Sequence, residues 1–230
     1  MIRLLSTAAA LSLIVATPAL ATPITLDESN VGESFTLSYD GFSDGTTIDG
    51  LGAEATFTLT GVTDHSFTFD YAVTNTTDSG LTSRISSFAF NTDPDIASAS
   101  STGAFNYTLT DSNYPNGIGN VDVCFKAART NSCAGNRGGI TEGNTGTGSL
   151  TLNFADIVDS ISLSDFFVRY QSITGAGHVS SASGAGTPTS TSTTSTTSGT
   201  TVPEPGMLGL FGAGLLGLGL MRRRRKPAVA

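Results

Sequence analysis

Residues 55–75 read ATFTLTGVTDHSFTFDYAVTN, and the order of their side chains decides the fold class. In the first half, apolar side chains stand at every second position, at Ala55, Phe57 and Leu59, with threonines between them. After a short polar break, the second half repeats the pattern. Alternation with a period of two predicts half-buried β-strands, and Phe, Val, Tyr and Thr favour strands. The stretch therefore predicts two strands, each with one apolar face and one hydroxyl-rich face.

The same alternation recurs from Ile24 to about Ile173, in runs such as ESFTLSY, AFNYTLT, VDVCF and SLTLNF. Asp-Gly, Asn-Gly and Gly-Gly pairs separate the runs and supply the positive φ angles of tight turns. The run SISLSDFFVRYQSIT changes phase at Asp165, which predicts a bulge there. We therefore expect an all-β fold, a single antiparallel β-sandwich of about eight to ten strands over residues 22–174. The side chains expected to point into its core are Phe35, Phe57, Phe69, Tyr107, Val123 and Leu152.

The N-terminal 21 residues have the three parts of a secretory signal peptide. Arg3 gives a cationic start, residues 4–15 form an apolar segment, and small residues precede and include Ala21. We expect signal peptidase to cut after Ala21, so that the mature chain folds outside the cytoplasm. In an exported chain, the closely spaced pair Cys124 and Cys133 predicts a local disulfide rather than a metal site.

The body of the chain is strongly acidic. Residues 22–201 contain 18 acidic and 5 basic residues. No nucleic-acid partner is expected, because nucleic-acid binding rests on cations that meet phosphates. One cluster of cations stands out, Lys126, Arg129 and Arg137. These residues either balance neighbouring carboxylates or contact an acidic extracellular polysaccharide.

Beyond Thr174 the alternation stops. From Thr187 to Thr201, 13 of 15 residues are Ser or Thr. Such a segment has too little apolar surface to offset the entropy of ordering, so residues 175–201 are expected to form a disordered linker. The linker is either a plain spacer or a carrier of glycans.

The chain ends in a short apolar run and a cationic cluster. Residues 206–221 carry no charge, and as a helix they would span about 24 Å, less than the ~30 Å hydrocarbon core of a bilayer. Six of these residues are glycines, which weaken a helix. We therefore expect a short transmembrane helix that anchors the chain only temporarily, with a basic cytoplasmic stop after it. The residues of the stop are Arg222, Arg223, Arg224, Arg225 and Lys226.

The ordered pattern VPEP, apolar run and RRRRK over residues 202–226 resembles the PEP-CTERM sorting signal of Gram-negative bacteria, a motif also known as the ice-binding protein C-terminal domain. The resemblance implies that an exosortase recognises the Pro-Glu-Pro region and removes the tail, and that the protein is associated with exopolysaccharide and biofilm. The run DFFVRYQSI before a Gly-rich stretch resembles small PEP-CTERM ectodomains of the cistern type. The residues that match the sorting motif are Val202, Pro203, Glu204 and Pro205.

No pattern of catalytic residues emerges, and no enzyme activity, cofactor or metal is expected. His65 precedes a strand and His178 lies in the expected linker, and no G-x-S-x-G elbow is present. The stretch EGNTGTGS precedes a strand and predicts a turn rather than a phosphate loop. Asp40, Asp44 and Asp49 fail the EF-hand pattern, although a looser calcium site stays open beside a plain turn loop.

The sequence thus predicts a non-catalytic surface or matrix protein, transiently anchored in the inner membrane and then held at the cell surface or released. The alternative is a glycan- or ice-binding module that uses a Thr-rich sheet face with Thr56, Thr58 and Thr60. An unrecognised hydrolase is the third reading.

Overall fold

The computed structural model describes residues 23–78 and 80–192. The predicted signal peptide, the predicted cleavage site at Ala21 and the whole segment 193–230 lie outside the described residues. Twelve strands and two short 3₁₀ helices make up the described chain. The strands are β1 (Ile24–Asp27), β2 (Ser34–Ser43), β3 (Thr46–Thr63), β4 (Ser66–Asn75), β5 (Thr82–Asp93), β6 (Ser98–Ser101), β7 (Tyr107–Tyr114), β8 (Gly119–Lys126), β9 (Ile140–Thr141), β10 (Thr145–Asn153), β11 (Ser160–Thr174) and β12 (Ser181–Ser192), and the 3₁₀ helices are η1 (Glu28–Asn30) and η2 (Gly103–Phe105).

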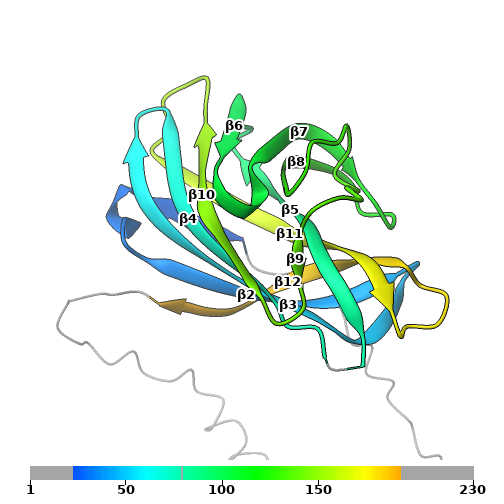
Figure 1. The fold of residues 1–230 in the computed structure, drawn as a ribbon. Helices are drawn as coiled ribbons and strands as arrows, with labels where there is room; N and C mark the ends of the chain where they lie inside the picture. Colours follow the sequence, from blue (N-terminus) through cyan, green and yellow to red (C-terminus); the bar gives the residue numbers. More distant parts are fainter. Residues whose placement is uncertain (1–22, 79, 193–230) are drawn as a thin grey trace, which may run out of the picture. The chain divides into compact units, whose positions relative to one another are not determined.

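All strands belong to one antiparallel sheet. Its order is β6-β10-β4-β3-β2-β12-β11-β5-β8-β7, with β1 paired to β11 and β9 paired to β5. The sheet curls until its two outermost strands lie close together (Figure 1), and the Thr108 hydroxyl of β7 donates to the Ala99 carbonyl of β6 at 3.1 Å. The exposed edges of the sheet are thereby largely covered, which protects them from pairing with other chains.

Aromatic side chains fill the space inside the curl. The Phe57 ring of β3 lies 5.6 Å from the Phe88 ring of β5 and 6.2 Å from the Phe166 ring of β11, measured between centroids. Because β3 does not pair with β5 or β11, these contacts require the sheet to fold over on itself. The predicted all-β antiparallel fold is confirmed, but the Phe-rich faces belong to one continuous sheet rather than to two separate sheets.

Five of the six predicted core residues are buried, and Tyr107 is the exception. The five buried residues expose no more than 3% of their surface, whereas Tyr107 exposes 39%. They are Phe35, Phe57, Phe69, Val123 and Leu152. The prediction for Tyr107 assumed one strand through AFNYTLT. In the structure, Phe105 ends η2 and packs in the core, and β7 starts only at Tyr107 with the opposite phase.

The predicted bulge in β11 is confirmed. Asp165 has a φ of 51°, and the pairing with β5 shifts register between Ser164 and Phe167. The extra residue turns Phe166 into the main core and lets Phe167 pack against a second apolar cluster. The bulge therefore allows adjacent Phe residues to be used on opposite sides of one strand.

The sheet extends further along the chain than expected. Residues 181–192, assigned above to a disordered linker, form β12 and pair with both β11 and β2. A side chain at Gly184 would have its Cβ 2.6 Å from the Asp40 carbonyl oxygen and 3.0 Å from the Tyr170 ring. Small residues are needed here because the large rings of neighbouring strands already fill the space. The disordered linker is therefore wrong for residues 181–192, and the ectodomain reaches Ser192.

Among residues 23–78 and 80–192, no helix is long and apolar enough to cross a membrane. The predicted transmembrane helix at residues 206–221 lies outside this part of the chain.

Candidate functional site

Strands β2, β3, β4 and β10 present a hydroxyl-rich outer face, opposite to the face that packs in the core. Alternation within ESFTLSY and ATFTLT puts the apolar residues inside and Ser34, Thr36, Thr56 and Thr58 outside. Antiparallel register brings these hydroxyls together in pairs, 2.7 Å apart for Ser34 and Thr58 and 2.9 Å apart for Thr36 and Thr56. We call this surface the hydroxyl face.

The pairing of hydroxyls continues into β4 and β10. Thr68 and Thr151 lie 3.2 Å apart, and Thr74 and Thr145 lie 2.8 Å apart, between their hydroxyl oxygens. Thr60 departs from this order, because the register shifts between Leu59 and Gly61 and the Thr60 hydroxyl donates to the Thr68 carbonyl instead. The predicted row Thr56, Thr58 and Thr60 is therefore regular only over its first two members.

The hydroxyl face is hollowed at its centre. In register, Thr56, Ala72 and Thr147 form one cross-strand row, and the methyl of Ala72 is the shortest outward side chain in that row. The hollow has a volume of about 460 Å³. We call it the Ala72 groove. Its lining includes Thr56, Thr58, Asp70, Ala72, Thr147 and Ser149.

Among the described residues that line the Ala72 groove, Asp70 is the only one with a charged side chain. The carboxylate is exposed, and within the described residues no side chain or backbone group donates a hydrogen bond to it. Strands β2, β3, β4 and β10 carry four carboxylates and no Lys or Arg. The groove therefore combines hydroxyls that donate and accept with a carboxylate that only accepts.

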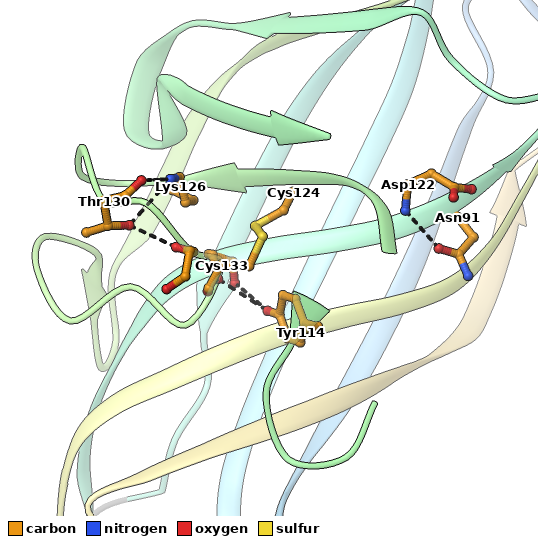
Figure 2. Close-up of a disulfide and its surroundings, with 9 residues drawn as sticks. Asn91, Tyr114, Asp122, Cys124, Lys126, Thr130 and Cys133 are labelled. Atoms are coloured by element: carbon orange, nitrogen blue, oxygen red, sulfur yellow. Dashed lines mark hydrogen bonds between the residues drawn. A yellow bond between two sulfur atoms is a disulfide. The ribbon is translucent and has the colours of Figure 1, made fainter. Parts of the chain in front are cut away.

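The cations of the described chain lie elsewhere, on β5, β8, β11 and the loop 127–139. Lys126 is buried, and its ammonium donates to the Thr130 carbonyl, as Figure 2 shows. Burial lowers the pKa of the Lys126 ammonium. Arg129 and Arg137 are exposed, so the structure does not combine Lys126, Arg129 and Arg137 into one cationic surface.

The predicted disulfide between Cys124 and Cys133 is confirmed, with the Cα atoms 6.1 Å apart. Figure 2 shows the disulfide between Cys124 of β8 and Cys133 of the loop that follows. This loop lies against β5, where the Ser87 hydroxyl donates to the Cys133 carbonyl at 2.8 Å. Tyr114 packs beside it in a second apolar cluster. Burial raises the pKa of the Tyr114 hydroxyl well above its usual value. This side of the sheet is thus a second core rather than an open surface.

The other candidate residues do not gather into a site. In the described part of the chain, no three His, Cys, Asp or Glu side chains are placed to hold a metal ion. Asp44 has a φ of 48° and, with Gly45, forms the turn between β2 and β3. His65 is exposed at the β3–β4 turn, with its Nδ1 3.0 Å from the Asp156 carbonyl oxygen. In EGNTGTGS, the predicted turn covers only Glu142, Gly143 and Asn144, and the residues from Thr145 onward lie in β10 itself.

Comparison with known proteins adds one finding at the C-terminus. Residues 201–226 match the PEP-CTERM protein-sorting motif. The chain carries a PEP-CTERM motif. This motif implies an exported protein that crosses the membrane and an exosortase as its processing partner. No curated protein and no solved structure matches the chain.

The PEP-CTERM match covers every residue predicted for sorting, from Val202 to Lys226. Their structure lies outside the described residues. The Ala72 groove was missed from the sequence, although a signal existed. In HSFTFDYAVTN the outward positions are Thr68, Asp70, Ala72 and Thr74, so one carboxylate and one methyl interrupt a row of threonines.

Proposed function

We propose that the protein is a non-catalytic component of the cell surface or extracellular matrix of a Gram-negative bacterium. Its PEP-CTERM motif holds it transiently in the inner membrane until an exosortase removes the tail. The motif at residues 201–226 is the observation that carries this proposal. The association with exopolysaccharide and biofilm rests on the resemblance to other proteins that carry this motif.

The ectodomain supports a passive role outside the cell. Three of its five cations serve the fold itself, because Lys126, Arg84 and Arg169 donate to backbone carbonyls or hydroxyls. The remaining surface is acidic and rich in hydroxyls, which keeps a protein soluble among acidic polymers. The disulfide fits an oxidising compartment.

The length of chain between the fold and the motif also fits processing at the membrane. β12 ends at Ser192, so ten residues precede Pro203. Fully extended, they reach at most about 33–36 Å. Pro203 and Pro205 disfavour a helix at the residues before them, which leaves an extended segment for a protease cleft. This length of chain supports processing by an exosortase while the sheet remains folded.

Intact-mass analysis of the surface fraction of producing cells tests the proposal. We expect a mature chain that starts at Thr22 and lacks the residues from about 203–206 onward. Replacing Glu204 with Gln, or both Pro203 and Pro205 with Ala, should trap the full-length chain at the inner membrane. Pro227→Ala, outside the matched residues, is the control and should be processed normally. A surface form that still carries Arg222 to Lys226 would show that the tail is a permanent anchor.

A second function is favoured by one observation, the paired hydroxyls across β2, β3, β4 and β10. We propose that this hydroxyl face is a binding surface for glycans or, as the competing reading, for ice.

A further inference from the structure

We propose that the Ala72 groove binds an uncharged saccharide chain, with Asp70 as the central acceptor of ligand hydroxyl groups. This inference deepens the second function above, and it rests on the proposed location outside the cell. It gives the binding a defined site and a chemical class of ligand.

The first argument is the state of Asp70. Its carboxylate is exposed in the groove, and none of the described residues donates to it. In register, Asp70 lies between Thr58 of β3 and Ser149 of β10. An ionised carboxylate has two oxygens that accept hydrogen bonds, and such charge-assisted bonds are the strong ones. Two neighbouring hydroxyls of a sugar ring match this acceptor pair.

The second argument is the polar lining around Asp70. The Ser149 hydroxyl lies 2.9 Å from the Thr102 hydroxyl, and the Thr58 hydroxyl lies 2.7 Å from that of Ser34. Each hydroxyl group has one donor and two acceptor positions, so each pair can still form further hydrogen bonds with a ligand. Sugar hydroxyls also donate and accept, and the groove crosses three strands, which suits a chain rather than a single small molecule.

The third argument comes from charge. The four strands of the hydroxyl face carry carboxylates and no cation, so a polyanion would be repelled here. A metal ion is not favoured either, since within the described residues no three potential ligands come together. A flat array of hydroxyls would suit ice better than this groove does, because the surface here is hollow and carries a charge at its centre. A neutral ligand rich in hydroxyls is the class that remains.

Among the described lining residues, Tyr71 is the only aromatic one, and it exposes just 3% of its surface, so it offers no open ring face for stacking. The Tyr71 ring points into the core, where its hydroxyl donates to the Thr102 carbonyl at 2.6 Å. Binding then depends on hydrogen bonds alone, each of which contributes little net free energy in water. We therefore expect weak binding to each sugar unit and stronger retention by a polymer that offers many units.

Affinity electrophoresis in native gels suits such weak binding. The exported protein is run in gels that contain dextran, mannan or galactomannan, with alginate as the anionic polymer and a polylysine gel as the cationic one. We expect at least one neutral polymer to retard the protein, and alginate to leave its mobility unchanged. Asp70→Asn should weaken the apparent affinity about tenfold or more, and Ala72→Leu should abolish retardation by filling the groove.

Matched variants distinguish binding in the groove from a change in net charge or a loss of the fold. Glu54→Gln removes the same charge from the same face but lies outside the lining residues, so its retardation should equal that of the unchanged protein. Circular dichroism establishes that each variant keeps the sheet. The proposal is overturned if no neutral polymer retards the protein, if Asp70→Asn and Ala72→Leu bind normally, or if polylysine alone is bound. Inhibition of ice recrystallisation that Ala72→Leu removes, without saccharide binding, assigns the face to ice.

Because this assay uses purified protein, its result does not depend on where the cell delivers the chain. A negative result leaves exosortase processing intact, and a failure of processing leaves the groove test valid.

Discussion

At the scale of single residues, the described chain has five cations, and two of them, Lys126 and Arg169, are buried. Arg169 exposes 6% of its surface and lies among neutral partners, with its guanidinium donating to the Ser181 hydroxyl at 2.8 Å and to that of Ser183 at 3.3 Å. Its Nε is buried without a hydrogen-bond partner. Burial lowers the pKa of the Arg169 guanidinium, and the nearby Tyr114 acts in the opposite direction. These cations hold strands and loops in place, and they leave the hydroxyl face purely acidic.

Buried tyrosines predict a loss of stability at alkaline pH. Burial raises the pKa of Tyr114 and of Tyr170 well above the usual value. Below about pH 10, the ordinary tyrosine pKa, these groups are neutral in both states and their contribution is complete. As the pH rises above that value, the unfolded chain releases protons that the folded chain keeps, so the free energy of unfolding falls.

The measurement follows tyrosinate absorbance and circular dichroism over the same alkaline titration. We expect the buried tyrosines to ionise together with loss of the sheet. Tyr170→Phe removes one such group and should shift the alkaline midpoint upward. Full ionisation of all tyrosines near pH 10 with an intact sheet would contradict this prediction.

At the scale of elements, β12 shows what the sequence pattern can and cannot predict. The strands in residues 55–75 are predicted correctly because apolar and polar side chains alternate along them, which indicates one buried and one solvent-exposed face. In β12 the inward positions include Gly184 and Gly186, so no alternation of large apolar residues is present. Strand β12 forms because it pairs with β11 on one side and with β2 on the other. The presence of both neighbours is a property of the whole fold. Local propensity is a weak guide when tertiary context decides.

The tight packing of β12 gives a prediction at this scale. Gly184→Val should destabilise the fold by about 1–3 kcal/mol or more, because the added side chain meets the Asp40 backbone and the Tyr170 ring. Ala185→Val lies next to it on the exposed side and should change stability by less than about 0.5 kcal/mol. Urea unfolding of both variants measures the difference. Equal stability of the two variants would show that β12 is not packed as described.

At the scale of the described ectodomain, the sheet is one nearly closed circuit of strands rather than two separate layers. The connection between its two halves runs through β12, which pairs with β11 on one side and β2 on the other. Sequence alone could not reveal this circuit, because register between distant strands does not follow from alternation within each strand. For the same reason it could not place Asp70 beside Ser149, or Ala72 beside Thr147, of β10.

Truncation tests this continuity. A chain that ends at Ser192 keeps every strand of the described residues and should unfold cooperatively with a β-type dichroism spectrum. A chain that ends at Ser180 lacks β12 and leaves β2 and β11 with unpaired edges, so we expect it to be unstable and to aggregate. Thermal unfolding and size-exclusion chromatography compare the two chains. The same midpoint for both would mean that β12 contributes nothing to the fold.

The position of β12 also sets an order of events during translocation. A chain that crosses the membrane from its N-terminus delivers β2 early and β12 last, yet Ser183 must pair with Phe42 for the sheet to be complete. Folding therefore cannot finish until β12 has emerged. Under the proposed route of export, a chain that stalls earlier leaves β2 and β11 with unpaired edges, so we expect it to be more open to proteolysis than the complete sheet.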